Sequence, residues 1–122
     1  MAKRFLDTNS IITDCTDISN VVISSKTLEE LENIKTSSHK DNDIKYKARV
    51  AVRAIREQKP EIIVVQQSDY DKIEELGLEI TNDNLIIASA CRYSQENPIV
   101  FVTHDILCSL IAEKYLGLNV EE

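Results

Sequence analysis

Acidic side chains at separated places in this sequence are the residues best suited to do chemistry. They are spread over nearly the whole chain of 122 residues, and each lies near an expected strand end or helix start: Asp7, Glu30, Asp83 and Asp105. Carboxylates that are brought together repel one another, and proteins usually resolve this repulsion by sharing a proton or by binding a divalent cation. We therefore predict that these side chains meet in one metal-binding site.

The chemistry of these side chains indicates which ion the site would take. Hard oxygen ligands without an accompanying histidine or cysteine favour Mg²⁺ or Mn²⁺ over zinc. Such ions can activate a water molecule and stabilise the leaving oxygen when a phosphodiester bond is hydrolysed. Because the sequence offers no obvious alternative nucleophile, we predict a metal-dependent phosphodiester hydrolase.

Predicted strands and helices alternate along the chain, which is typical of a parallel sheet covered by helices. Residue patterns predict strands at 3–6, 20–24, 61–67, 99–102 and 118–120, and helices at 9–16, 27–35, 42–58, 69–76, 82–93 and 104–116. The aliphatic run at 62–65 predicts a strand that is buried on both faces. We expect one domain over residues 1–122, an α/β fold in the form of a three-layer α/β/α sandwich with a central parallel sheet of about five strands.

This architecture explains how the acids could meet, because functional groups in parallel α/β sheets collect outside the carboxyl ends of the strands. Asp7 directly follows the first predicted strand, and Asp105 closely follows the fourth. Asp83 lies in the first turn of a helix, and the positive end of a helix dipole lowers the cost of gathering negative charge there and at Asp105. Glu30 lies one turn beyond Thr27, the expected helix cap, and can face the same cleft.

The segments around these acids resemble the four ordered motifs of PIN domains. They are Phe5-Leu6-Asp7-Thr8-Asn9, the strand at 21–23 with the helix start at 27–35, the segment 81–88 and the segment 100–105. Glu30 matches the family position better than Glu29, because Glu30 directly precedes Leu31. Residues 28–31, Leu-Glu-Glu-Leu, also resemble the branch of PIN-like ribonucleases found with PhoH-type ATPases.

The resemblance implies a PIN-like fold and a metal-dependent endoribonuclease that hydrolyses RNA phosphodiester bonds, with DNA left open as a second substrate. It implies that the four acids bind one or two Mg²⁺ or Mn²⁺ ions and that Asn9 and Thr103 orient ligands or water. Asn84 and His104 replace residues found in many family members, and His104 is a candidate for contacting or protonating the scissile phosphate.

Two other functions stay open beside the ribonuclease. One is a non-catalytic PIN-like module that binds RNA or protein. The other is the toxin component of a toxin/antitoxin pair, whose partner would be an antitoxin. The resemblance is also compatible with a homodimer.

Basic side chains recur along the predicted helix 42–58, at Lys45, Arg49, Arg53 and Arg56. This stripe is either an exposed amphipathic edge or a surface that contacts the substrate backbone beside the acidic cleft. The formal net charge of −7 does not favour nucleic-acid binding by bulk electrostatics. Cations held by the carboxylates would cancel part of that charge, so net charge does not decide between these interpretations.

Cysteine usage and hydropathy indicate where the protein works. The three cysteines are widely spaced and suggest neither a disulfide framework nor a zinc site, which fits a reducing compartment. No apolar stretch approaches the roughly 18 residues that a membrane span needs. We therefore expect a cytoplasmic protein with no membrane partner.

Overall fold

The sheet of this protein has five parallel strands, with the first strand of the chain at its centre. The computed structural model describes residues 2–122. The strand order is β3-β2-β1-β4-β5, and each neighbouring pair is parallel. The strands are β1 (Lys3–Leu6), β2 (Val22–Ser24), β3 (Glu61–Ile63), β4 (Ile99–Val102) and β5 (Val120–Glu121). The parallel α/β architecture expected from the alternating pattern is confirmed.

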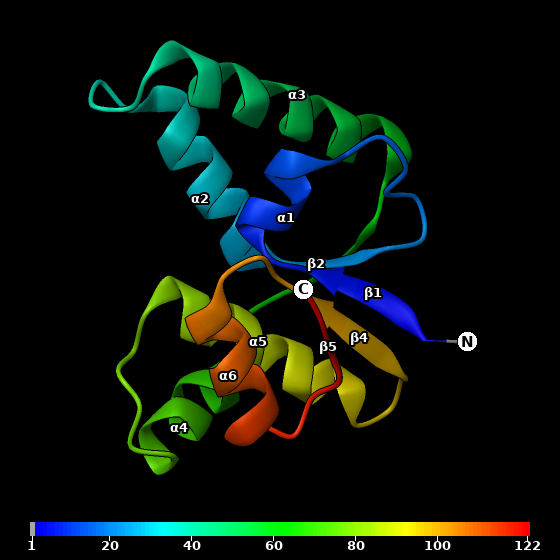
Figure 1. Cartoon of the computed structure of the whole chain (residues 1–122), viewed down its shortest axis with the longest axis vertical. Coiled ribbons are helices and arrows are strands. Elements are labelled where there is room, and N and C mark those ends of the chain that lie inside the picture. The colour runs from blue at the N-terminus through cyan, green and yellow to red at the C-terminus, as the bar shows by residue number, and fades with distance from the viewer. Residues whose placement is uncertain (1) are drawn as a thin grey trace.

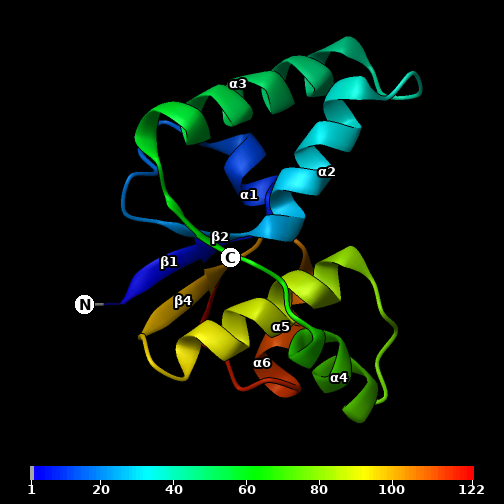
Figure 2. The same ribbon diagram turned by 180° about the vertical axis from the view of Figure 1, so that it is seen from behind.

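Helices cover both faces of the sheet, as Figure 1 shows and Figure 2 repeats from behind. One layer holds α1 (Thr8–Thr13), α2 (Ser25–Thr36) and α3 (Asn42–Gln58), and the other holds α4 (Gln67–Glu75), α5 (Asn82–Ser94) and α6 (Ile106–Lys114). The bounds of α3 are those expected from the sequence, whereas the other helices have shifted ends. Among residues 2–122, every helix is too short or too polar to cross a lipid bilayer.

The sheet divides the core into two parts, because successive strand residues point to opposite faces. Leu6, Ile23 and Val102 pack with the layer of α1, α2 and α3. Phe5 and Phe101 pack with α5 and α6 on the other side, and their ring centroids are 6.2 Å apart. Full burial of such a side chain contributes about 1.5–3 kcal/mol, so the central strands β1 and β4 are held firmly in place.

The prediction that residues 61–67 form a strand buried on both faces is wrong. β3 ends at Ile63 and lies at an edge of the sheet, where Ile62 is 38% and Val64 is 64% exposed. Ile63 packs inward against the layer of α5 and α6. Val65 also packs inward, against Ile73 of α4. An aliphatic run shows that a segment can be buried, but the number of neighbouring strands depends on the rest of the fold.

The start of α2 also differs from the prediction, and the difference matters for the site. Ser24, not Thr27, caps this helix, and its hydroxyl accepts a hydrogen bond from the backbone N of Lys26 (3.1 Å). Thr27 is instead fully buried within the first turns of α2. Its side chain is therefore free to contact residues of α1 beside the carboxyl end of β1.

Candidate metal centre

Asp7 is held rigidly at the carboxyl end of β1. It caps α1, and its Oδ1 accepts a hydrogen bond from the backbone N of Ser10 (2.9 Å). Its Oδ2 accepts from the Thr103 hydroxyl (2.5 Å), which follows β4. The residue is 6% exposed, and within residues 2–122 no lysine, arginine or histidine forms an ion pair with it. Asp7 is thus a buried carboxylate that is oriented by neutral donors alone.

Glu30 reaches the same region from α2. The Thr8 hydroxyl lies 2.6 Å from Glu30 Oε1, to which it donates, and 3.1 Å from the hydroxyl oxygen of Thr27. Burial raises the pKa of Glu30, and the charges of Asp83 and Asp7 raise it further, while hydrogen bonds from Thr8 and Asn82 act in the opposite direction. These causes place Glu30 within electrostatic reach of two other acids from distant parts of the chain.

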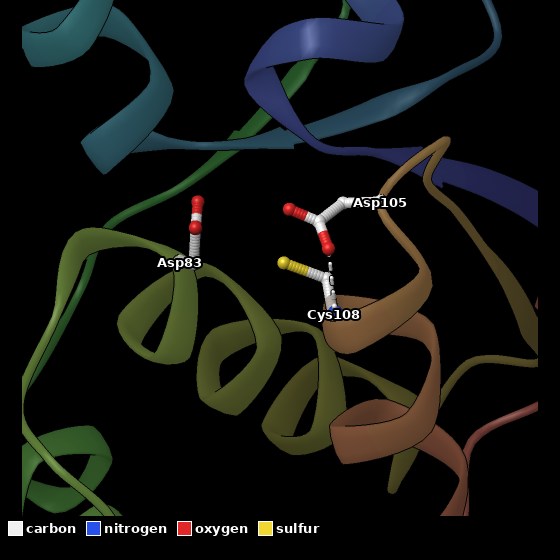
Figure 3. A group of neighbouring side chains, drawn as sticks. All are labelled: Asp83, Asp105 and Cys108. Carbon is white, nitrogen blue, oxygen red and sulfur yellow. Dashed lines mark hydrogen bonds between the residues drawn. The ribbon is translucent and has the colours of Figure 1, made fainter.

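Asp83, in the first turn of α5, lies near Asp105, which directly precedes α6 (Figure 3). Asp105 caps α6, and its Oδ1 accepts hydrogen bonds from the backbone N of Leu107 (2.8 Å) and of Cys108 (3.2 Å). The Thr103 hydroxyl oxygen accepts from the backbone N of Asp105 (3.1 Å), so one threonine orients both Asp7 and Asp105. Burial raises the pKa of Asp83, with further increases from the charges of Asp105 and Asp7.

Cys108 belongs to this cluster, which the sequence reasoning missed. A carboxylate oxygen of Asp83, one of Asp105 and the Cys108 sulfur all lie within 4.8 Å of one another. Burial, followed by the charges of Asp83, Asp105 and Asp7, raises the pKa of the Cys108 thiol to about 12. The expectation that the acids have no cysteine beside them is therefore wrong, because α6 turns residue 108 toward the site.

Asp7, Glu30 and Asp83 line a pocket of about 310 Å³ at the carboxyl edge of the sheet, and Asp105 lies beside Asp83 outside this lining. Its lining includes Asp7, Glu30 and Asp83, together with Thr8, Asn9, Asn33, Ile34, Lys40 and Asn82. Lys40 is the one basic residue in this lining, against three carboxylates, and it forms no ion pair with them within residues 2–122. Oxygen-rich sites with excess negative charge suit Mg²⁺ or Mn²⁺, so the residues present fit a divalent cation.

The supporting residues expected from the sequence lie in different places. Asn9 lines the pocket, and Thr103 bonds Asp7 directly. The Asn84 side chain instead donates to the carbonyl oxygen of Glu79 (2.7 Å), and Asn82 occupies the pocket wall. His104 lines a separate pocket on the other side of α1. The structure thus brings Asn9 to the pocket lining and connects Thr103 to Asp7 and Asp105 by hydrogen bonds. Asn84 and His104 are neither in the lining nor hydrogen-bonded to any of the four acids within residues 2–122.

The basic stripe forms a second concave surface, on α3 and α2. Arg49, Arg53 and Arg56 line a pocket of about 220 Å³ together with Lys35, which the sequence reasoning did not select. None of these arginines pairs with an acid in the part of the chain from residue 2 to 122. Lys45, although it belongs to the stripe, is not among the lining residues.

Comparison with known proteins adds independent findings. Residues 5–122 match the model of a family described as PIN domain. No curated protein matches the sequence. Three solved structures share the fold. VapBC-5 from Mycobacterium tuberculosis, a member of the VapBC family of toxin-antitoxin systems, has a TM-score of 0.64 and 18% sequence identity, with 98% of each chain covered. DNA-bound VapBC from Salmonella typhimurium has a TM-score of 0.60 and 19% identity, with 99% of this chain and 98% of that chain covered. VapBC2 from Rickettsia felis, bound to a promoter DNA fragment, has a TM-score of 0.58 and 21% identity, with 98% of each chain covered.

Proposed function

Because this chain belongs to the PIN-domain family, whose members are generally metal-dependent nucleases, we propose that it is a Mg²⁺- or Mn²⁺-dependent endoribonuclease. The observation that carries the proposal is that Asp7, Glu30 and Asp83 line one pocket and that Asp105 lies within electrostatic reach of Asp83. Within residues 2–122, none of these acids forms an ion pair. We also propose that residues 1–122 act as a single catalytic domain.

Each acid has a defined role in this proposal. Asp7 and Asp105 would hold the metal at the ends of β1 and β4, and Thr103, which bonds both residues, would keep their relative position. Glu30 and Asp83 complete the set from α2 and α5. A bound divalent cation lowers the pKa of water and neutralises charge on the scissile phosphate. Thr8 donates a hydrogen bond to the Glu30 carboxylate, and Asn82, which also lines the pocket, donates another.

The basic pocket supports a polyanionic substrate. Arg49, Arg53 and Arg56 have no acidic partner in the described chain, so their charges are available to phosphate groups. Lys45 extends the same stripe along α3. We propose that these side chains contact the RNA backbone and so add affinity without reading sequence.

The proposal is tested by substituting two acids that contact Thr103. Asp7→Asn and Asp105→Asn should each lower Mn²⁺-dependent cleavage of labelled single-stranded RNA by about a hundredfold or more, since even loss of an outer-shell partner costs 10–100-fold. Asp71→Asn, at an exposed acid on α4, is the matched control. A single-stranded DNA of equal sequence shows whether DNA is also accepted. Cleavage by both variants at the wild-type rate would refute the mechanism.

A toxin role is a second proposal, favoured by the shared fold of the three toxin-antitoxin structures. In that case the protein would have an antitoxin as its partner. Expression of the wild type should arrest growth, whereas the Asp7→Asn variant should not, and co-expression of the protein encoded by the neighbouring gene should relieve the arrest. Growth that is equal for wild type and variant would count against a toxin.

Metal titration distinguishes a non-catalytic binding module from the proposed nuclease and the proposed toxin. A protein that binds Mn²⁺ in its folded state is stabilised by about 2.7 kcal/mol when the metal concentration is 100 times its Kd. A melting temperature that does not respond to millimolar Mn²⁺ would favour the non-catalytic module.

A further inference from the structure

Cys108 gives the acid cluster a ligand of a different chemical character. The residue is 6% exposed and packs within the core beneath α6. Figure 3 shows its sulfur directed toward Asp83, below the Asp105 carboxylate. Apart from Asp83, no group of residues 2–122 offers this sulfur a hydrogen bond. A buried thiol thus points into the metal centre from the same helix turn that Asp105 caps.

The spacing of the three groups suits a tetrahedral ion. Metal ligands at about 2.0 Å for oxygen and about 2.3 Å for sulfur lie roughly 3.5 Å from one another around a tetrahedral Zn²⁺. The three ligand atoms here are already within 4.8 Å of one another. Rotation of the Asp83 side chain, which is exposed, can close the remaining gap without moving the core.

The group formed by Asp83, Asp105 and Cys108 prefers a different ion from the one that the four acids prefer. Mg²⁺ demands oxygen ligands in octahedral geometry, and sulfur is a poor ligand for it. Thiolate favours thiophilic ions, and Zn²⁺ binds a given site more tightly than Mn²⁺ in the general affinity order. An ion bound by the sulfur therefore withdraws Asp83 and Asp105 from the ion that serves hydrolysis.

We propose that Asp83, Asp105 and Cys108 form a subsite for a thiophilic divalent cation, Zn²⁺ or Cd²⁺, which competes with the catalytic ion and holds the enzyme inactive. The inhibitory part rests on the proposed nuclease function, whereas the binding part does not. On binding, the thiol gives its proton to the solvent, a sulfur–metal bond forms, and the fourth position of the ion remains for water.

Cadmium provides a readout that does not depend on activity. A cadmium–thiolate bond produces an ultraviolet charge-transfer absorption that carboxylates do not give. The protein to titrate is the double variant Cys15→Ser, Cys91→Ser, in which Cys108 is the sole thiol, because those two cysteines lie away from the acids. CdCl₂ should produce the absorption at one equivalent, and ZnCl₂ should abolish it by displacement.

The matched variant adds Cys108→Ser to that background. It should lose the absorption and bind Zn²⁺ about 10–100-fold more weakly in calorimetry, a range typical for a weakened metal shell. Circular dichroism shows whether this variant folds, and Asp83→Asn, at an exposed position, is the second variant and should also weaken Zn²⁺.

The outcomes separate the two proposals. Absence of the absorption in the Cys108-only protein would overturn the subsite, even if the enzyme cleaves RNA. A full absorption that requires Cys108 supports the subsite, even if no metal yields cleavage and the nuclease proposal fails.

Discussion

Asp69 and Asp7 are both buried, with 2% and 6% of their surfaces exposed, yet their surroundings are opposite in charge. Asp69 lies in the first turn of α4, where its carboxylate accepts from Nε (3.0 Å) and Nη2 (3.2 Å) of Arg92 in α5 and from the backbone N of Gln66 (2.9 Å). Asp7 accepts from neutral donors only, and the charges of other carboxylates reach it.

The contrast separates two uses of a buried acid. A carboxylate that is paired with a cation and saturated with donors is part of the structure, and breaking the pair leaves a buried charge uncompensated. A carboxylate that is oriented but not neutralised keeps its charge available for a ligand. Asp7 is of the second kind, and the predictions below test whether this distinction holds.

The largest expected effect is on stability at Asp69. Asp69→Asn should lower the free energy of unfolding by about 3 kcal/mol, at the low end of the range for a broken buried pair because Arg92 keeps partial solvent contact. Asp7→Asn in metal-free buffer should cause no such loss, because it removes a charge that nothing neutralises. Urea unfolding measures the free energy of unfolding of both variants. Equal destabilisation by the two substitutions would contradict the distinction between Asp69 and Asp7.

The second prediction concerns the residue that orients Asp7. Thr103→Val removes the hydrogen bond to Asp7 Oδ2 and the acceptor for the backbone N of Asp105. Mn²⁺ affinity should fall by about 10–100-fold, the usual cost of losing an outer-shell partner. Thr103→Ser keeps the hydroxyl and should restore most of the affinity. Calorimetric titration measures both, and a failure of serine to restore binding would point to packing instead.

A similar contrast exists among the cations. Arg92 is paired with Asp69, whereas Arg53 forms no ion pair within residues 2–122, so Arg53 should be available to phosphate. Arg53→Gln should weaken RNA binding and lower the slope of log K against log salt by about 1, because one phosphate contact is lost. Lys47→Gln, on the same helix but at a lysine paired with Asp43, is the control and should leave the slope unchanged.

The smallest expected effect is a pH-dependent rise in the melting temperature of the Asp83→Asn variant. The pKa of Asp83 is raised in the folded state above its ordinary value of 3.8, so folding favours its protonated form. The stability that this provides is present below pH 3.8 and is lost as the pH rises through the higher folded pKa. Asp83→Asn should therefore melt higher than wild type in EDTA at neutral pH, and the gap should close on acidification. A gap that is constant with pH would contradict this.

Local signals were sufficient to predict some parts of the fold. The ends of α3 follow from a capping Asp41, a continuous apolar face and Pro60 after the helix. The positions of Asp7 and Asp105 follow from their place after strands, because the ends of parallel strands share one edge. In each case the signal lies within a few residues of the feature it predicts.

Other parts depend on contacts that no local pattern records. Asn82 and Asn84 share the first turn of α5 but point about 160° apart, so only the rotation of the packed helix decides which one reaches the pocket. Cys108 meets Asp83 because α5 and α6 pack together, and Lys35 meets Arg53 because α2 lies against α3. The edge position of β3 likewise depends on strand order and not on its own residues.

The central position of β1 has a consequence for how the protein is made. Asp7 is held by Thr103, which is 96 positions later in the chain, and β1 pairs along its length with β4. Such long-range pairing forms late in folding, since distant segments must first be brought together. A growing polypeptide therefore cannot assemble the candidate metal centre until translation has passed Asp105. A chain with the proposed nuclease activity would therefore be inactive while it is still being synthesised.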